Sequence, residues 1–93
     1  MAKYHLATVG STKVLLGEAS TKIVTSLKDA GPEGMTYADL GEVTDSPVKS
    51  LYVLGQRLRD AGLAKSITNK RGERSLVLVT PKRVHIEAVT TLG

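Results

Sequence analysis

The chain has 93 residues, of which 41% are hydrophobic and 24% are charged, and its formal net charge is +4 at neutral pH. This length predicts one domain, and the balanced composition excludes a disordered tail and a membrane protein. The absence of cysteine excludes disulfides, thiol catalysis and cysteine-based zinc sites. Since no signal peptide or run of about 18 apolar residues is present, we expect a soluble cytoplasmic protein.

Aromatic residues make up only 3% of the sequence, namely Tyr4, Tyr37 and Tyr52, so the core must consist of aliphatic side chains. A domain of this size buries only about 60% of its unfolded surface, and a second copy would cover more apolar area. We therefore expect a homodimer. We assign its contacts to residues 4–16 and 84–92, whose apolar side chains exceed what one three-helix core can cover.

The positive charge is concentrated in one part of the chain. Residues 46–83 contain nine cations and two acids, a net charge of +7, whereas the remaining residues sum to −3. Such an asymmetry is expected when one surface meets a polyanion, but a solvated charged face has the same composition. Charge alone leaves both interpretations open.

The first elements in chain order are less clearly marked than the later ones. Residues 4–9 alternate weakly and fit a short strand, while residues 14–16 fit either a strand or a helical turn. Ser20 then opens a helix at 21–30, where apolar residues recur at helical spacing. The turn at 31–34 contains the glycine and proline that end this helix.

Two further helices follow, each with a capping residue. Thr36 is a good N-cap for a short helix at 37–43. Ser46-Pro47 is typical of a helix start, with serine as the cap and proline in the first turn, and Gly62 is typical of a helix end. These signals predict a third helix at 47–61, about 22 Å long and able to lie along a DNA major groove.

After Gly62 the spacing of apolar residues is no longer that of a helix. Residues 63–69 and 74–80 predict two strands joined by a turn that contains Gly72, which makes a β-hairpin. Thr80-Pro81 repeats the cap and proline of a helix start. Apolar residues at 84, 88 and 89 then fit one face of a last helix at 81–89.

Four segments in this order resemble the winged-helix superfamily of DNA-binding domains over residues 20–89. They are Gly34–Leu40 (GMTYADL), Ser46–Lys49 (SPVK), Leu58–Leu63 (LRDAGL) and Leu78–Arg83 (LVTPKR). The last two are similar to segments of MarR-type and related bacterial and archaeal regulators. The chain lacks the long terminal helices of MarR-type dimers and the usual second acidic-basic pair of their wing, so the resemblance is to the domain type alone.

The resemblance implies an α+β fold, a winged helix-turn-helix with a three-helix core, a two-stranded hairpin as the wing and a C-terminal helix. Residues 1–19 lie outside the resemblance, and we expect them to form an N-terminal arm, as a strand or a helical turn, that is a candidate for the dimer contact. Residues 20–93 would form the DNA-binding domain.

A helical wheel of the third helix separates a core face from a candidate reading face. Leu51, Leu54 and Leu58 share one arc, flanked by Val48, Gly55 and Ala61. The candidate base-reading residues are Lys49, Ser50, Tyr52, Val53 and Gln56. Lysine can donate to guanine, glutamine can pair with adenine, and valine can pack on a thymine methyl. The alternatives are a solvated helix face and a singly exposed valine of no significance.

Other residues are candidates for contact with the DNA backbone. We expect Arg57, Arg59 and Lys65 to meet phosphates, together with the helix starts at Thr36 and Ser46. The resemblance also implies that the hairpin tip reaches the neighbouring minor groove or its phosphates through Asn69, Lys70, Arg71 and Arg74. The alternative for the tip is an ordinary polar turn.

We therefore expect a sequence-specific protein that binds double-stranded DNA, namely a small transcriptional regulator. The alternative is a winged-helix module for protein interaction or assembly that does not read DNA. His5 and His85 lie far apart in sequence, and no carboxylate pair, serine elbow or phosphate loop is present. We expect no enzymatic activity, no metal or other cofactor and no membrane partner, and no small-molecule ligand is evident.

Overall fold

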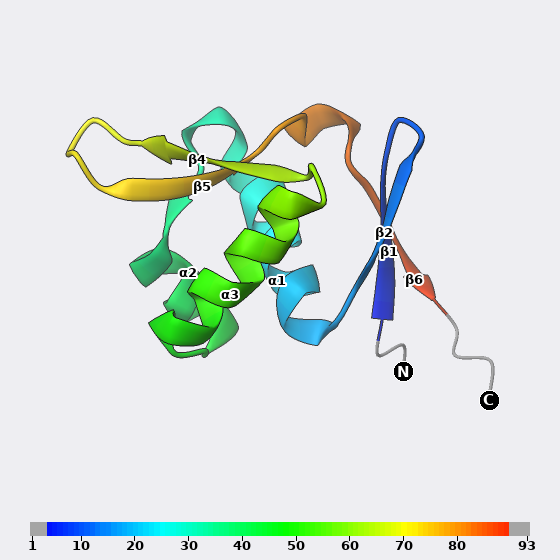
Figure 1. Ribbon diagram of the computed structural model, residues 1–93, viewed down its shortest axis with the longest axis horizontal. Coiled ribbons are helices and arrows are strands. Elements are labelled where there is room, and N and C mark those ends of the chain that lie inside the picture. Colours follow the sequence, from blue (N-terminus) through cyan, green and yellow to red (C-terminus); the bar gives the residue numbers. More distant parts are fainter. Residues whose placement is uncertain (1–3, 90–93) are drawn as a thin grey trace.

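Three helices lie between a pair of strands at the start of the chain and the strands of its second half in the computed structural model, which describes residues 4–89 (Figure 1). The elements are β1 (Tyr4–Val9), β2 (Thr12–Leu16), α1 (Glu18–Ala30), the 3₁₀ turn η1 (Gly31–Glu33), β3 (Met35–Thr36), α2 (Tyr37–Thr44), α3 (Val48–Asp60), β4 (Ala64–Thr68), β5 (Arg74–Leu78), the 3₁₀ turn η2 (Pro81–Arg83) and β6 (His85–Val89). The protein is thus a small α+β domain. Its described part contains three α-helices and two antiparallel sheets.

The terminal sheet joins both ends of the described chain in the order β2-β1-β6, with β1 in the middle. Ala7 lies opposite Val14 on one side and Ile86 on the other, so these three side chains share a face. Ala7 is fully buried, which identifies this face as the one turned toward the core. From the sequence, residues 14–16 fitted either a strand or a helical turn. In the structure they belong to the strand β2.

The prediction of a last helix at 81–89 is wrong. Only η2 is helical, for a single turn, and residues 85–89 form the strand β6 against β1. Val84 is buried and Ile86 half-buried, whereas His85 and Glu87 are exposed. This alternation has the period of a strand. Pro81 does start a helical turn, η2. The helix does not continue beyond it, because the backbone groups of residues 85–89 pair with those of β1.

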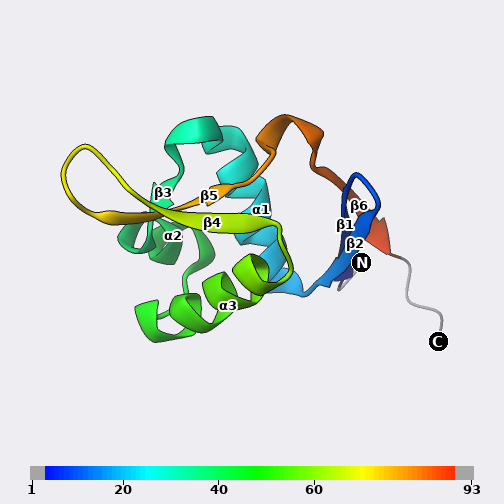
Figure 2. The ribbon, with the colours of Figure 1, turned by 45° about the horizontal axis from the view of Figure 1, so that its top comes forward.

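The second sheet has the order β3-β5-β4, with β5 in the middle. The pair β4–β5 is the predicted hairpin, and its register places Ala64 opposite Leu78 and Thr68 opposite Arg74. The two-residue strand β3, which the sequence did not predict, covers the other edge of β5. The hairpin projects beyond the helices, and its tip (yellow) lies at the opposite end of the molecule from the terminal sheet in Figures 1 and 2.

The three helices were predicted with small errors at their ends. Thr36 caps α2 as expected, since its hydroxyl accepts from the Asp39 amide at 3.2 Å. Gly62 follows α3 with a positive φ of 81°, also as expected. Helix α1 begins three residues earlier than predicted, at Glu18 after Gly17, so Ser20 does not open it.

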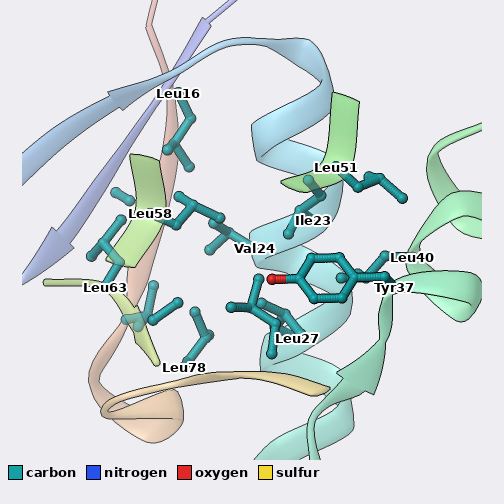
Figure 3. Close-up of a cluster of buried hydrophobic side chains, with 14 residues drawn as sticks. Leu16, Ile23, Val24, Leu27, Tyr37, Leu40, Leu51, Leu58, Leu63 and Leu78 are labelled. Carbon is teal, nitrogen blue, oxygen red and sulfur yellow. The ribbon is translucent and has the colours of Figure 1, made fainter. Parts of the chain in front are cut away.

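The core is a single cluster of aliphatic side chains from the helices and both sheets. Figure 3 shows these side chains, with the one buried aromatic ring, that of Tyr37, beside Leu27 and Leu40 toward one side of the cluster. Gly34 closes the core at the start of β3, with φ 68° and ψ −163°. A β-carbon at this position would overlap the Leu76 carbonyl oxygen in β5, so the close approach of the two strands requires glycine.

Candidate nucleic-acid interface

Helix α3 presents one buried and one exposed face. Leu51 and Leu58 are 1% and 2% exposed, and Gly55 between them is also buried. The five candidate base-reading residues are all exposed: Lys49, Ser50, Tyr52, Val53 and Gln56. None of these five belongs to the core cluster or to its half-buried margin. Val48, which the wheel placed beside the core, is also exposed.

An aromatic pair fixes α3 against α2. The rings of Tyr52 and the buried Tyr37 lie 4.5 Å apart between centroids and are tilted by 41°. One helical turn further on, a β-carbon at Gly55 would come within 3.1 Å of the Tyr37 hydroxyl. Tyr37 therefore contacts α3 at two successive turns. Sequence reasoning missed this role of Tyr37, although a glycine in the middle of a helix is the signal of a close approach.

The two arginines of α3 have different surroundings. Arg57 is exposed, and no hydrogen bond or ion pair engages its side chain within residues 4–89. Arg59 is half-buried, and its Nη1 donates to the Ser66 hydroxyl of β4 at 3.1 Å. This hydrogen bond joins the end of α3 to the hairpin and uses one of the donors of the Arg59 guanidinium. Arg57 is thus the freer of the two to meet an external anion.

Asn69 organises the tip of the hairpin. Its side-chain oxygen accepts from the amides of Arg71 and Glu73, both at 2.9 Å, and its side-chain amide donates to the Glu73 carboxylate at 3.2 Å. Its backbone amide also donates to the Glu73 carbonyl. The side chain proposed from the sequence as a DNA contact is therefore engaged in shaping the turn, as an Asx-type side chain often is.

The cations of the hairpin remain exposed, Lys65 near its base and the other three at or beside the turn. Lys65 lies on β4, Lys70 and Arg71 lie in the turn, and Arg74 begins β5. The one acid of the tip, Glu73, is held by Asn69. In Figures 1 and 2 the tip and the N-terminal end of α3 lie at the same end of the molecule. The exposed cations of the hairpin tip and the start of the exposed α3 face thus lie at the same end of the fold.

The two helix starts that were proposed as phosphate sites have different surroundings. Thr36 is half-buried, and its hydroxyl accepts from the Asp39 amide, beside an exposed carboxylate that would repel a phosphate. Ser46 does not cap α3, since Pro47 occupies that position and no side chain caps it. The Ser46 hydroxyl instead donates to the Thr44 carbonyl at 3.3 Å.

A surface hollow of about 390 Å³ lies between the hairpin tip and the start of α2. Its wall contains the acids Glu33 and Asp39 and the cations Lys70 and Arg71. Because acids and cations alternate around it, the hollow favours neither an anion nor a cation.

A metal site and a membrane-spanning helix each have requirements that the described residues can be compared with. Within residues 4–89, no group of three His, Cys, Asp or Glu side chains could hold a metal ion. No helix in this part of the chain is long and apolar enough to cross a membrane. The sequence matches no protein-family model, no curated protein and no solved structure.

Proposed function

We propose that this chain is a winged-helix protein that binds double-stranded DNA in a sequence-specific manner, as a small transcriptional regulator. Helix α3 would read the major groove, and the hairpin β4–β5 would contact the adjacent backbone or minor groove. The observation that carries this proposal is the exposed face of α3, where lysine, serine, tyrosine, valine and glutamine side chains stand outside the core. These are side chains suited to the edges of base pairs.

The element order supports the same proposal. Three helices are followed by a hairpin, and the short strand β3 between α1 and α2 pairs with β5, the second strand of that hairpin. The resemblance to winged-helix domains implies the three helices and the hairpin in this order. Helix α3 spans 13 residues, about 20 Å, which fits the length of groove that one recognition helix occupies.

Binding to duplex DNA at varied salt concentration tests the proposal. Each phosphate contact releases counterions, so the logarithm of the binding constant should fall linearly with the logarithm of salt concentration, by about 0.9 per contact. With the cations of α3 and the hairpin, we expect about four to eight contacts for a dimer. Failure to bind any duplex at low salt would reject the proposal.

Single substitutions should separate base reading from backbone contact. Replacing Lys49 or Gln56 by alanine is expected to cost about 1–3 kcal/mol on the preferred site and to relax its sequence preference. Replacing Arg71 should weaken binding to all sequences alike, since phosphate contacts carry no sequence information. Affinities for the preferred duplex and a scrambled duplex measure the difference. Equal losses on both duplexes for all three variants would show that α3 does not read bases.

A second candidate function is a module for protein interaction or assembly. Exposed apolar side chains on α2 and α3 favour it: Val43, Val48, Tyr52 and Val53 are each between 44% and 52% exposed. Such side chains are typical of a surface that another protein covers. If the chain binds a protein partner with little dependence on salt concentration, and binds no DNA duplex, this function is favoured over the first.

A homodimer is part of the proposal, with the terminal sheet as its contact. The sheet face turned away from the core carries Tyr4 opposite Val89 and Leu6 opposite Leu15, with Tyr4 and Leu15 45% and 60% exposed. Residues 90–92 of the segment assigned to the dimer lie outside the described part of the chain. Light scattering at micromolar concentration should give twice the chain mass, and the mass of one chain would contradict a dimer.

A further inference from the structure

A second surface hollow lies between the end of α1 and the connection from β5 to β6. Its volume is about 570 Å³, within the range that holds small organic ligands. The residues that line it are Lys28 of α1, Gly31 and Pro32 of η1, Thr80, and Lys82 and Arg83 of η2. It is separate from the exposed face of α3 and from the hairpin tip, so no residue of the proposed DNA-binding surface contributes to it.

The charge of this hollow has one sign. Among the described residues that line it, all three ionisable side chains are cations and none is an acid. Lys28, Lys82 and Arg83 are exposed, and the one ion pair within residues 4–89, between Lys22 and Glu18, lies elsewhere on α1. Three unpaired cations from segments far apart in sequence therefore surround one space. An anion placed there would gain charge-assisted hydrogen bonds that the protein itself does not supply.

The rest of the wall is largely apolar. It consists of Pro32, the methylene stems of the three cations and the backbone of Gly31, in front of which lies open space. Thr80 adds a hydroxyl that is buried and has no hydrogen-bond partner within residues 4–89. A buried hydroxyl without a partner is costly, and the Thr80 side chain has to rotate about χ1 before a ligand in the hollow could accept from it.

We propose that this hollow binds a small organic anion, with its apolar body against Pro32 and Gly31 and its carboxylate or sulfonate among Lys28, Lys82 and Arg83. This role is additional to DNA binding and does not depend on it. Since η2 connects the hairpin to the terminal sheet, a bound anion would hold this connection against the end of α1.

The test uses anilinonaphthalene sulfonate, a fluorescent aromatic anion, and phenylnaphthylamine, the same ring system without the sulfonate. The anion is expected to bind saturably at one site per chain, and at least about tenfold more tightly than the uncharged molecule. The double variant Lys82→Gln, Arg83→Gln should lose about tenfold or more in affinity for the anion alone. Lys22→Gln, which removes a lysine from the exposed side of the same helix as Lys28, is the control and should bind like the unaltered chain.

Competition identifies the source of the anion. Benzoate should displace the fluorescent anion, whereas sulfate at equal ionic strength and a DNA duplex should not. Equal affinity for the charged and uncharged probes, or equal losses in the double variant and the control, would overturn the proposal. Displacement by sulfate as effective as that by benzoate, or displacement by the duplex, would also overturn it, because the cations would then form part of a general polyanion surface. Because the substituted residues are exposed, we expect the variants to keep the fold, and circular dichroism of each variant measures this.

Discussion

Replacing Gly34 by alanine is expected to destabilise the fold by about 2–6 kcal/mol, the sum of backbone strain and overpacking. Its φ of 68° and ψ of −163° lie in a region that is almost restricted to glycine. The added β-carbon would also overlap the Leu76 carbonyl and lie 3.1 Å from the β-carbon of Val77. Both neighbours belong to β5, the central strand of its sheet, so the strand cannot easily move away. Urea unfolding followed by circular dichroism measures the loss.

Gly31→Ala is the matched control. Gly31 has a similar conformation, with φ 70° and ψ −144°, but no atom lies within 4 Å of the position that its β-carbon would take. Alanine there should cost only the strain, about 1–3 kcal/mol. The difference between the two variants measures the close approach of η1 and β3 to β5. If both variants lose the same stability, the contact with Leu76 does not limit this position.

Leu51→Ala should lower the free energy of unfolding by about 2–5 kcal/mol, the range observed when a buried leucine is truncated. Leu51 is 1% exposed and belongs to the same core cluster as Ile23 and Leu40 (Figure 3). Its loss leaves a cavity between α3 and the rest of the core. Because a small domain has a total stability of about 5–15 kcal/mol, the variant should show a large fall in melting temperature.

Val53→Ala provides the comparison within the same helix. Val53 is 52% exposed, so its truncation should change the free energy of unfolding by no more than about 0.5 kcal/mol. A loss of stability at Val53 similar to that at Leu51 would mean that the exposed face of α3 is covered by other parts of the protein. In that case this face could not contact DNA.

The separation of the two faces of α3 was predictable from the sequence. The wheel placed Leu51 and Leu58 inward and Lys49, Val53 and Gln56 outward, and the observed burial agrees. The caps at Thr36 and Gly62 were also predictable. Each of these signals lies within a few residues of the element that it marks, which is the range over which helix periodicity and capping act.

The sequence could not show which segments pair at a distance. Apolar residues at 84 and 88 fit both a helix and a strand, and the decision depends on whether β1 is present alongside. The same limit applies to the candidate site. The Arg59–Ser66 bond and the stacking of Tyr52 on Tyr37 join elements that only the fold brings together. Asn69 is an exception, since an asparagine before a turn signals its own role in shaping it.

The pairing of β1 with β6 has a mechanical consequence. The two strands are antiparallel, with Tyr4 opposite Val89, so the described chain begins and ends at neighbouring positions. A pulling force applied through these two ends would act across the strands and separate the pairs one at a time, like a zipper. We expect the terminal sheet to open at low force while the helices and the hairpin remain folded. Once β6 has separated from β1, the force would act next on η2, which lines the cation-lined hollow, and only later on α3.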